Sequence, residues 1–181
     1  HDVLEKKLPE YRELGNLLPL ENSLDKHLID SWRGIVSKDL RRFVEIKIDT
    51  INIRTLLRCK VSGIPSRDYL IEGGYLQTRM KDMERGEVKD VLEILDKTPY
   101  GKASREAMSE YEKTKSLVSF EKKLESEVMR FLKENAILRP LGVFSVISFI
   151  NAKRREVKNL NTIVICKHHD IPPEGIKEIL T

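Results

Sequence analysis

Residues that interrupt or crosslink a chain are scarce in this sequence. Its 181 residues include only 9 glycines, 7 prolines and 2 cysteines. So few turn-forming residues favour a helical fold, and two cysteines exclude a disulfide framework. Aromatic residues make up 6%, yet hydrophobic residues reach 40%, which is enough for a folded core. The composition therefore predicts a globular, mostly helical protein whose two thiols are reduced.

Long apolar runs are also missing. The longest, residues 141–152, is interrupted by Ser145, Ser148 and Asn151. A membrane-spanning helix needs about 20 consecutive apolar residues, so this run is too short. We expect a protein that does not cross a bilayer but is able to dock on a membrane complex.

An excess of one charge is nearly absent as well. The chain has 33 basic and 29 acidic residues, a net charge of +4 and a pI of about 9.0. The charges are interspersed, as they are on solvated helices, and no basic stretch is interleaved with aromatic residues. A basic helical module that binds nucleic acid therefore remains open as an alternative, with little to favour it.

What the sequence does contain is a repeat. Residues 52–65 (NIRTLLRCKVSGIP) align with residues 159–172 (NLNTIVICKHHDIP) at an offset of 107, and six of the fourteen positions are identical. Average residue usage would give about one match by chance. Just upstream, the same offset pairs Asp49 with Glu156. We infer a duplication.

The repeat extends toward the N-terminus with a shorter offset. Tyr11 aligns with Tyr111 and Glu21 with Glu121, 100 residues apart, so an insertion is expected near residues 137–143 of the second copy. We predict two duplicated helical subdomains related by pseudo-symmetry, residues 1–100 and 101–181. Residues 98–104 (TPYGKAS) are the expected boundary.

Hydrophobic periodicity indicates several amphipathic helices. The expected helices cover residues 20–35, 84–98, 120–135 and 171–180. The last begins with two prolines, which the first turn of a helix tolerates. Gly73 and Gly74 predict a turn.

The repeated segment at residues 45–60 allows two interpretations. Alternating Val44, Ile46 and Ile48 are typical of a strand, but the periodic region runs over residues 40–61, far longer than a usual strand. A helical wheel places Lys47 with the arginines on one side and the Asp49–Asn52 pair opposite. We therefore predict a helix.

Four polar residues are the candidate structural sites of that helix and its copy: Asp49 and Asn52, and their equivalents Glu156 and Asn159. Each pair lies in the middle of an apolar face, where an unpaired polar group costs about 1–3 kcal/mol. The recurring acidic-x-x-Asn pattern therefore predicts buried polar groups with a shared kind of partner. Acid–base catalysis by Asp49 and Glu156 is the less favoured interpretation.

The basic side of the same helix carries Arg54, Arg58 and Lys60. These residues either contact an acidic partner or form a solvated face, and the sequence leaves both open because the second copy has Asn161 and Ile165 in place of the arginines.

Metal and nucleotide chemistry have weak support. Cys166 with His168, His169 and Asp170 is the one stretch that suggests a metal-dependent enzyme, but the first copy does not repeat the cluster. A polar helix end is the favoured interpretation. Gly73 and Gly74 lack the Gly-x-x-x-x-Gly-Lys-Ser/Thr pattern of a phosphate loop, so we expect no cofactor.

Three segments carry a family resemblance: DTINIRTLLRCK, LIEGGYL, and RPLGVFSVISFINAKRREVKNLNTIVICKHHDIPPEGIKEIL. Together they resemble the C-type subunit of archaeal A-type ATP synthases, which is equivalent to the C-type subunit of bacterial V-type enzymes and the d-type subunit of eukaryotic V-ATPases. The resemblance spans most of the 181 residues. That family has three such units in one chain, and only two are found here. We expect that the first unit is missing, which fits a start at His1.

The resemblance implies an all-α, funnel-shaped fold with pseudo-threefold symmetry and no catalytic activity. It also implies a place on the cytoplasmic face of the membrane, in a V- or A-type ATPase that moves protons or sodium ions. There the protein would join the central-stalk subunits, of D and F type, to the membrane proteolipid ring. These are expectations from the family, which residue patterns alone do not supply.

Overall fold

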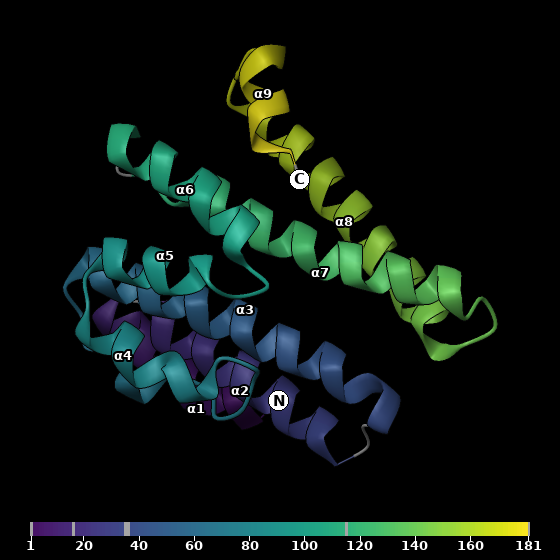
Figure 1. Ribbon diagram of the computed structural model, residues 1–181. Helices are drawn as coiled ribbons and strands as arrows, with labels where there is room; N and C mark the ends of the chain where they lie inside the picture. Colours follow the sequence, from purple (N-terminus) through teal and green to yellow (C-terminus); the bar gives the residue numbers. More distant parts are fainter. Residues whose placement is uncertain (1, 16, 35–36, 115, 181) are drawn as a thin grey trace. The chain divides into compact units, whose positions relative to one another are not determined.

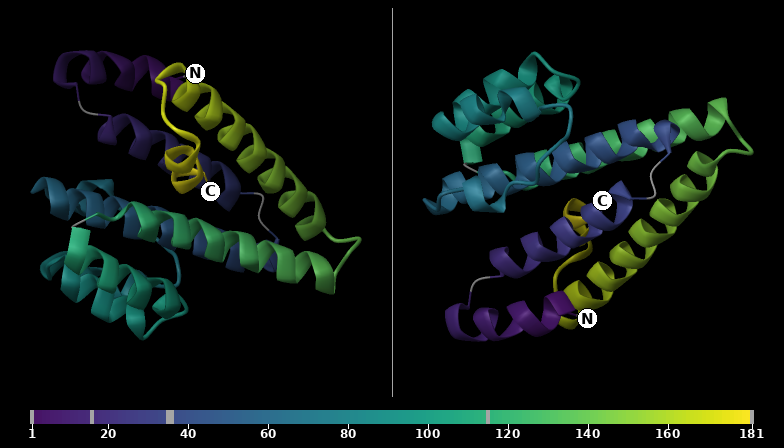
Figure 2. Two further views of the ribbon diagram at one scale, coloured as in Figure 1. Left: turned by 90° about the horizontal axis from the view of Figure 1, so that it is seen from above. Right: turned by 90° about the horizontal axis from the view of Figure 1, so that it is seen from below.

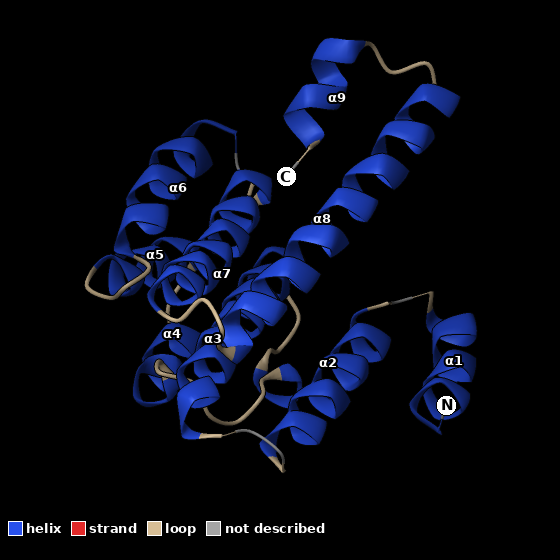
Figure 3. Cartoon of the chain, turned by 90° about the vertical axis from the view of Figure 1, so that its right-hand side faces the viewer, coloured by secondary structure: helices blue, strands red, loops and turns tan. Residues whose placement is uncertain are grey.

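The computed structural model describes residues 2–15, 17–34, 37–114 and 116–180 of the chain. Over these residues it consists of helices, turns and loops without a strand (Figure 3). The prediction of an all-α fold is confirmed for the part of the chain that is described. The strand interpretation of residues 45–60 is wrong, because the whole segment lies within one helix.

The chain, whose helices are labelled in Figure 1, forms two compact units, 1–125 and 126–181. The elements of the first are α1 (Asp2–Leu14), α2 (Leu18–Arg33), α3 (Lys38–Ser62), two short 3-10 helices, η1 (Arg67–Tyr69) and η2 (Gln77–Arg79), α4 (Met80–Arg85), α5 (Val88–Asp96), α6 (Gly101–Thr114) and the start of α7 (Val118–Leu138). The second unit holds the rest of α7, then α8 (Val143–His168) and α9 (Pro173–Ile179).

The division into compact units differs from the predicted boundary at residues 98–104. That segment lies inside unit 1, where Tyr100 and Ser104 are buried. Residues 101–114 pack with the first copy because α6 covers α5. The duplicated helical subdomains 1–100 and 101–181 stay a prediction.

The helix predictions agree with the structure apart from their ends. Residues 20–35 correspond to α2, whose predicted last residue, Ile35, lies outside the described residues. Residues 84–98 do not form one helix, because Gly86 is extended and ends α4. Glu87 then starts α5 with a capping box, in which its backbone N–H donates to Asp90 Oδ2 at 2.7 Å.

The core of unit 1 lies between α3 and the helices that follow it. Ile53, Leu56 and Leu57 on α3 are at most 2% exposed and pack in one cluster with α4, α5, α6 and the start of α7. The other fully buried members of the cluster are Leu76, Met83, Val91, Leu92, Leu95, Phe120 and Leu124. Helix α2 also packs against α3, so α3 is buried along most of its length.

The two copies of the repeated segment end in the same way. At the end of α3, Gly63 has φ +68° and the Ile64 N–H donates to the Cys59 carbonyl at 2.9 Å. At the end of α8, Asp170 has φ +54° and the Ile171 N–H donates to the Cys166 carbonyl, also at 2.9 Å. Both are Schellman-type ends with a left-handed residue. This local likeness agrees with the sequence repeat.

Unit 2 is built on a helical hairpin. A turn joins α7 to α8 (Figure 2) within the predicted connection at residues 137–143. In this turn the Gly142 N–H donates to the Arg139 carbonyl at 2.9 Å. Phe131 and Phe144 meet edge to face with ring centroids 5.9 Å apart. At the far end of α8, Cys166 and Ile176 are buried where α9 folds back.

Candidate functional site

The most highly organised polar site lies on α3, where one helical turn holds the loop that follows. The Asn52 side chain donates from Nδ2 to the Ile71 carbonyl at 2.8 Å and accepts from the Ile71 N–H at Oδ1, also at 2.8 Å. Asn52 therefore satisfies both backbone groups of one residue, as a neighbouring strand would. It is 1% exposed.

Asp49 lies one turn earlier on the same face and is fully buried. Its Oδ1 accepts from the Leu76 N–H at 3.0 Å, and its Oδ2 accepts from the Tyr100 hydroxyl at 2.9 Å. Asp49 and Asn52 together bind the backbone at both ends of residues 71–76. We call these two residues the α3 clamp and residues 71–76 the clamped loop.

The clamped loop contains Gly73 and Gly74, at the predicted turn, with φ of +99° and +87°. These values lie in a region that glycine adopts most readily. At Gly74 there is a second requirement, because a Cβ added there would lie 2.4 Å from Asp49 Oδ1. The carboxylate packs directly against the glycine backbone, so the site needs glycine for its space as well as its conformation.

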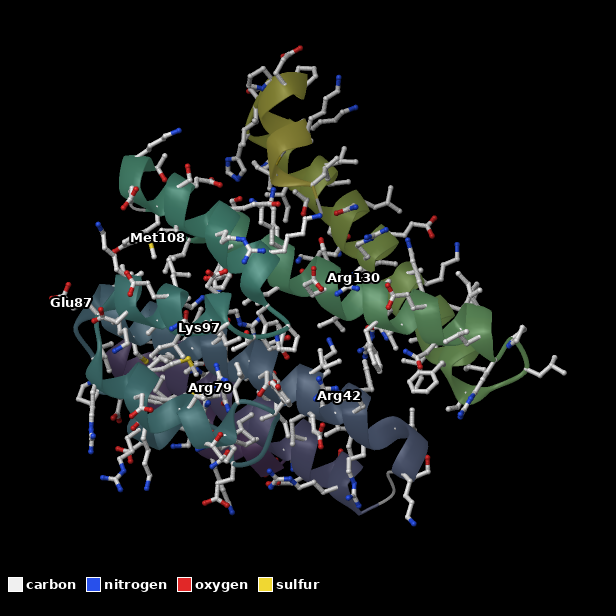
Figure 4. The ribbon with its side chains drawn as sticks, viewed as in Figure 1. Arg42, Arg79, Glu87, Lys97, Met108 and Arg130 are labelled. Atoms are coloured by element: carbon white, nitrogen blue, oxygen red, sulfur yellow. The ribbon has the colours of Figure 1, made fainter. Side chains whose placement is uncertain are left out.

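Burial sets the electrostatics of the clamp. Removal from water raises the pKa of Asp49 from 3.8 to about 6, even though the Leu76 N–H and the Tyr100 hydroxyl act to lower it. Arg42, labelled in Figure 4, also lowers this pKa through its charge, and its guanidinium lies 4.6 Å from the Tyr75 ring centroid. At neutral pH the Asp49 carboxylate is thus ionised at a cost in desolvation free energy.

The predicted basic face of α3 is engaged inside unit 1. Arg54 lies 3.3 Å from Asp25 on α2. Arg58 makes a two-pronged pair with Glu121 of α7 and lies 3.6 Å from Glu21 of α2. The Glu121 hydrogen bonds raise the pKa of Arg58. The two arginines therefore join α3 to carboxylates of α2 and of α7.

Lys60 serves a different purpose from the arginines. Its ammonium donates to the Glu84 carbonyl at 2.8 Å and to the Gly86 carbonyl, so it caps the C-terminal end of α4. Desolvation lowers the pKa of Lys60. Contact with a partner through Arg54, Arg58 and Lys60 stays a prediction, and the structure gives each of the three a partner within its own unit.

The second copy does not repeat the clamp, which corrects the prediction for Glu156. Its side chain is 56% exposed and accepts from Lys153 Nζ at 2.7 Å. Asn159 is half-buried. The physical reason is the cover: the loop and helices at residues 64–114 bury Asp49, whereas unit 2 contains no such segment over Glu156 in its described residues.

The structure shows no metal centre in the described part of the chain, where no group of three His, Cys, Asp or Glu side chains converges. His168, His169 and Asp170 are all exposed at the end of α8.

Unit 1 has a shallow groove of about 780 Å³ whose lining includes Arg79, Lys97 and Met108 (Figure 4). Side chains of both charges line it, without the arrangement of a catalytic centre.

Sequence reasoning missed Tyr100, Ile71 and Leu76 as parts of this site. The backbone groups of Ile71 and Leu76 carry no residue-specific signal, and Tyr100 lies 51 residues after Asp49. The Gly73–Gly74 pair was the one available sign that a backbone approaches closely here.

Comparison with known proteins decides the family. The sequence model of the ATP synthase (C/AC39) subunit family matches residues 1–179. This chain belongs to the ATP synthase (C/AC39) subunit family. The match confirms the resemblance seen in the sequence. No solved structure matches the chain significantly.

Several relatives are named as the C-type subunit of an A-type ATP synthase. The protein of Methanocaldococcus jannaschii is 34% identical over 98% of this chain and 48% of its own length. Those of Methanothermobacter thermautotrophicus and Haloferax volcanii are 35% and 34% identical, over 98% and 97% of this chain and 50% and 53% of their own lengths. The chain spans about half the length of the relatives it matches. Their names describe a subunit of an ATP synthase, in agreement with the expectation of a subunit and not a separate enzyme.

The sequence predicts a chain that does not cross a bilayer. Within the described residues, no helix combines the length and apolar character that crossing a bilayer requires. The ATP synthase (C/AC39) family chain thus has no candidate span in that part of its sequence.

Proposed function

We propose that this chain is a non-catalytic part of the subunit that couples rotation in a V/A-type ATPase. In this role it joins the central-stalk subunits of D and F type to the proteolipid ring, on the cytoplasmic face of the membrane. The observation that carries the proposal is the family match over residues 1–179. The proposal holds for either pumped ion, proton or sodium.

The packing of unit 1 supports this role. A part that transmits torque must resist shear between its helices, and directional hydrogen bonds fix the relative positions of the groups that they join. The α3 clamp holds the loop at residues 71–76 by three backbone hydrogen bonds, at Ile71 and Leu76. We propose that Asp49 and Asn52 are structural polar residues that stiffen the unit.

The alternative of nucleic-acid binding gains no support from the basic residues of α3. Arg54 and Arg58 already face carboxylates, and Lys60 faces backbone carbonyls. A phosphate backbone would have to displace these partners.

The test of the proposed function is assembly. The longest natural polypeptide that contains this sequence is mixed with the D and F stalk subunits and the proteolipid ring of its own organism, and native mass spectrometry records the complexes. We expect one complex that contains stalk, polypeptide and ring, and no stalk–ring complex without the polypeptide. A polypeptide that binds neither stalk nor ring would refute the proposal.

The stiffening role has its own measurement. ATP hydrolysis and ion uptake are measured together in vesicles that contain the assembled complex, with wild-type chain, Asp49→Leu and the exposed control Asn161→Asp. We expect Asp49→Leu to lower the number of ions moved per ATP, while the control matches wild type. Equal ratios of ions moved to ATP hydrolysed for all three proteins would show that the α3 clamp has no role in coupling.

A further inference from the structure

The outer face of α8 carries a heptad pattern. Its positions follow alternating spacings of three and four residues: Val143, Val146, Ile150, Lys153, Val157, Leu160, Val164 and Lys167. We call these eight residues the heptad seam. Every first position of the heptad is a β-branched valine or isoleucine, and Leu160 stands at a fourth position. This is the arrangement that coiled-coil helices present to a partner helix.

The seam is exposed along its whole length. Its apolar members are 45% (Val143), 58% (Val146), 48% (Ile150), 57% (Val157), 56% (Leu160) and 66% (Val164) exposed. The inner face of α8 is instead the one that carries Phe144 and Cys166, which are buried. The apolar members extend from Val143 to Val164, about 32 Å along the helix with Lys153 among them, which is far more than scattered surface residues.

The first copy shows what such a face accepts. By the 107-residue offset, Leu160 corresponds to Ile53 and Val164 to Leu57. Those two α3 residues are 0% and 2% exposed, in the cluster formed with α5 and α6. The equivalent positions on α3 therefore pack against helices.

The charge of α8 selects among possible helices. The helix carries five Lys and Arg residues and one acidic residue, Glu156. Lys153 and Lys167 occupy seam positions, with Arg154 and His168 beside them. The Lys153–Glu156 pair is exposed on both sides and contributes little, so the seam remains electropositive.

A second copy of the chain does not fit this pattern. Two α8 helices in parallel would place Lys153 of one copy opposite Lys153 of the other. An antiparallel pair would bring a seam lysine of one copy within about one helical turn of a seam lysine of the other. Repulsion disfavours both. A lipid surface fits poorly too, because Lys153 lies between Ile150 and Val157 in the middle of the apolar stripe and would enter the hydrocarbon.

We propose that the heptad seam is a docking surface for an acidic, heptad-patterned helix of another protein. The partner helix places its apolar stripe against the valines and isoleucine and its carboxylates around Lys153 and Lys167. This proposal stands apart from the proposed function, since it follows from the pattern and charge of α8.

Two synthetic helices test it on the 181-residue chain. Both have four heptads with isoleucine and leucine in the stripe, and they differ in having glutamate or lysine at the flanking positions. Fluorescence anisotropy gives their Kd values. We expect the acidic helix to bind at least about tenfold more tightly, with an affinity that falls as salt rises.

Variants locate the binding surface. Val157→Glu is expected to weaken binding of the acidic helix at least about tenfold. Val118→Glu is the matched control, because Val118 is 63% exposed on α7 outside the seam, and it should leave Kd unchanged. Reversal of charge by Lys153→Glu with Lys167→Glu should transfer the preference to the basic helix. Circular dichroism confirms that each variant is folded.

Four outcomes would overturn the proposal. One is equal affinity for the two synthetic helices. A second is sedimentation that shows a dimer which Val157→Glu dissociates, since the occupant is then a second copy. A third is binding to vesicles of phosphatidylcholine and phosphatidylglycerol that Val157→Glu abolishes. The last is protection of Val157→Cys from maleimide in the longest natural polypeptide that contains this sequence, because its own residues then cover the seam.

Discussion

Arg58 donates to both carboxylate oxygens of Glu121, from Nε at 2.7 Å and from Nη2 at 2.6 Å. The pair connects α3 to α7 across 63 residues of sequence. Glu21, which the repeat aligns with Glu121, lies 3.6 Å from Nη1 of the same arginine. One guanidinium thus lies between equivalent glutamates of the two copies, whereas the second copy has Ile165 in place of Arg58.

This pair should contribute more to stability than an ordinary surface ion pair. A double-mutant cycle with Arg58→Ala and Glu121→Ala is expected to give a coupling energy of about 1 kcal/mol, because the two-pronged geometry fixes both side chains. The control cycle at Arg130 and Glu134, a more exposed pair on one helix, should give about 0.3–0.5 kcal/mol. Urea unfolding measures both, and equal coupling energies would contradict the expectation.

Replacement of Asp49 should separate charge from hydrogen bonding. Asp49→Leu leaves the Leu76 N–H and the Tyr100 hydroxyl without this acceptor, so we expect a loss of about 1–3 kcal/mol in the free energy of unfolding. Asp49→Asn keeps an oxygen for Leu76 and removes the buried charge. At pH 7 it should therefore be at least as stable as wild type. A leucine variant as stable as the asparagine variant would show that the two hydrogen bonds contribute nothing.

The pH dependence of stability follows from the raised pKa of Asp49. The folded protein takes up this proton near pH 6, and the unfolded chain takes it up near 3.8. Ionisation of Asp49 therefore opposes folding above pH 6, and its cost disappears as the pH falls toward 3.8. The full effect is about 3 kcal/mol.

Urea unfolding at pH 7.5 and pH 4.5 measures this contribution as the difference between wild type and Asp49→Asn. We expect wild type to gain stability relative to the variant at the lower pH. Asp25, whose pKa is also raised mainly by desolvation, acts in the same direction, so both proteins must retain it. A difference that is independent of pH would contradict the assignment.

Gly63 is the control for Gly74, the glycine of the clamped loop that lies against Asp49. Both have positive φ, +68° at Gly63 and +87° at Gly74, but an added Cβ meets Asp49 at Gly74 and nothing within 4 Å at Gly63. Gly63→Ala should cost about 1 kcal/mol from the backbone alone. Gly74→Ala should cost at least about 2 kcal/mol more, because it also displaces a buried carboxylate. Thermal melts with equal losses would argue against the close approach.

The burial of Asp49 and Asn52 follows from sequence reasoning because a helical wheel depends only on local spacing. The wheel places both residues on the side opposite Arg54 and Arg58. In the structure this segment is a helix, and both residues are buried. Their partners depend on the path of the chain, and Ile71 is 19 residues from Asn52 while Leu76 is 27 from Asp49. Periodicity has no information about contacts at such separations.

The repeat misled the prediction for Glu156 for a related reason. Equivalent residues give equivalent helices, as the matching ends of α3 and α8 show. They do not give equivalent surroundings. Asp49 is buried by the clamped loop, whereas Glu156 faces solvent and pairs with Lys153. For the same reason the exposure of Leu160 and Val164 could not be predicted from the burial of their counterparts on α3.

The α3 clamp also sets which positions of the loop tolerate change over evolution. Its three bonds to residues 71–76 reach the peptide backbone and not the side chains of that loop. Ile71 and Leu76 are thus replaceable by any residue except proline that fills the same buried space, because only proline lacks the backbone N–H that these bonds need. Gly74 has no such freedom. The clamp thus constrains the backbone conformation of the loop, and only at Gly74 does the Asp49 carboxylate also fix the residue type.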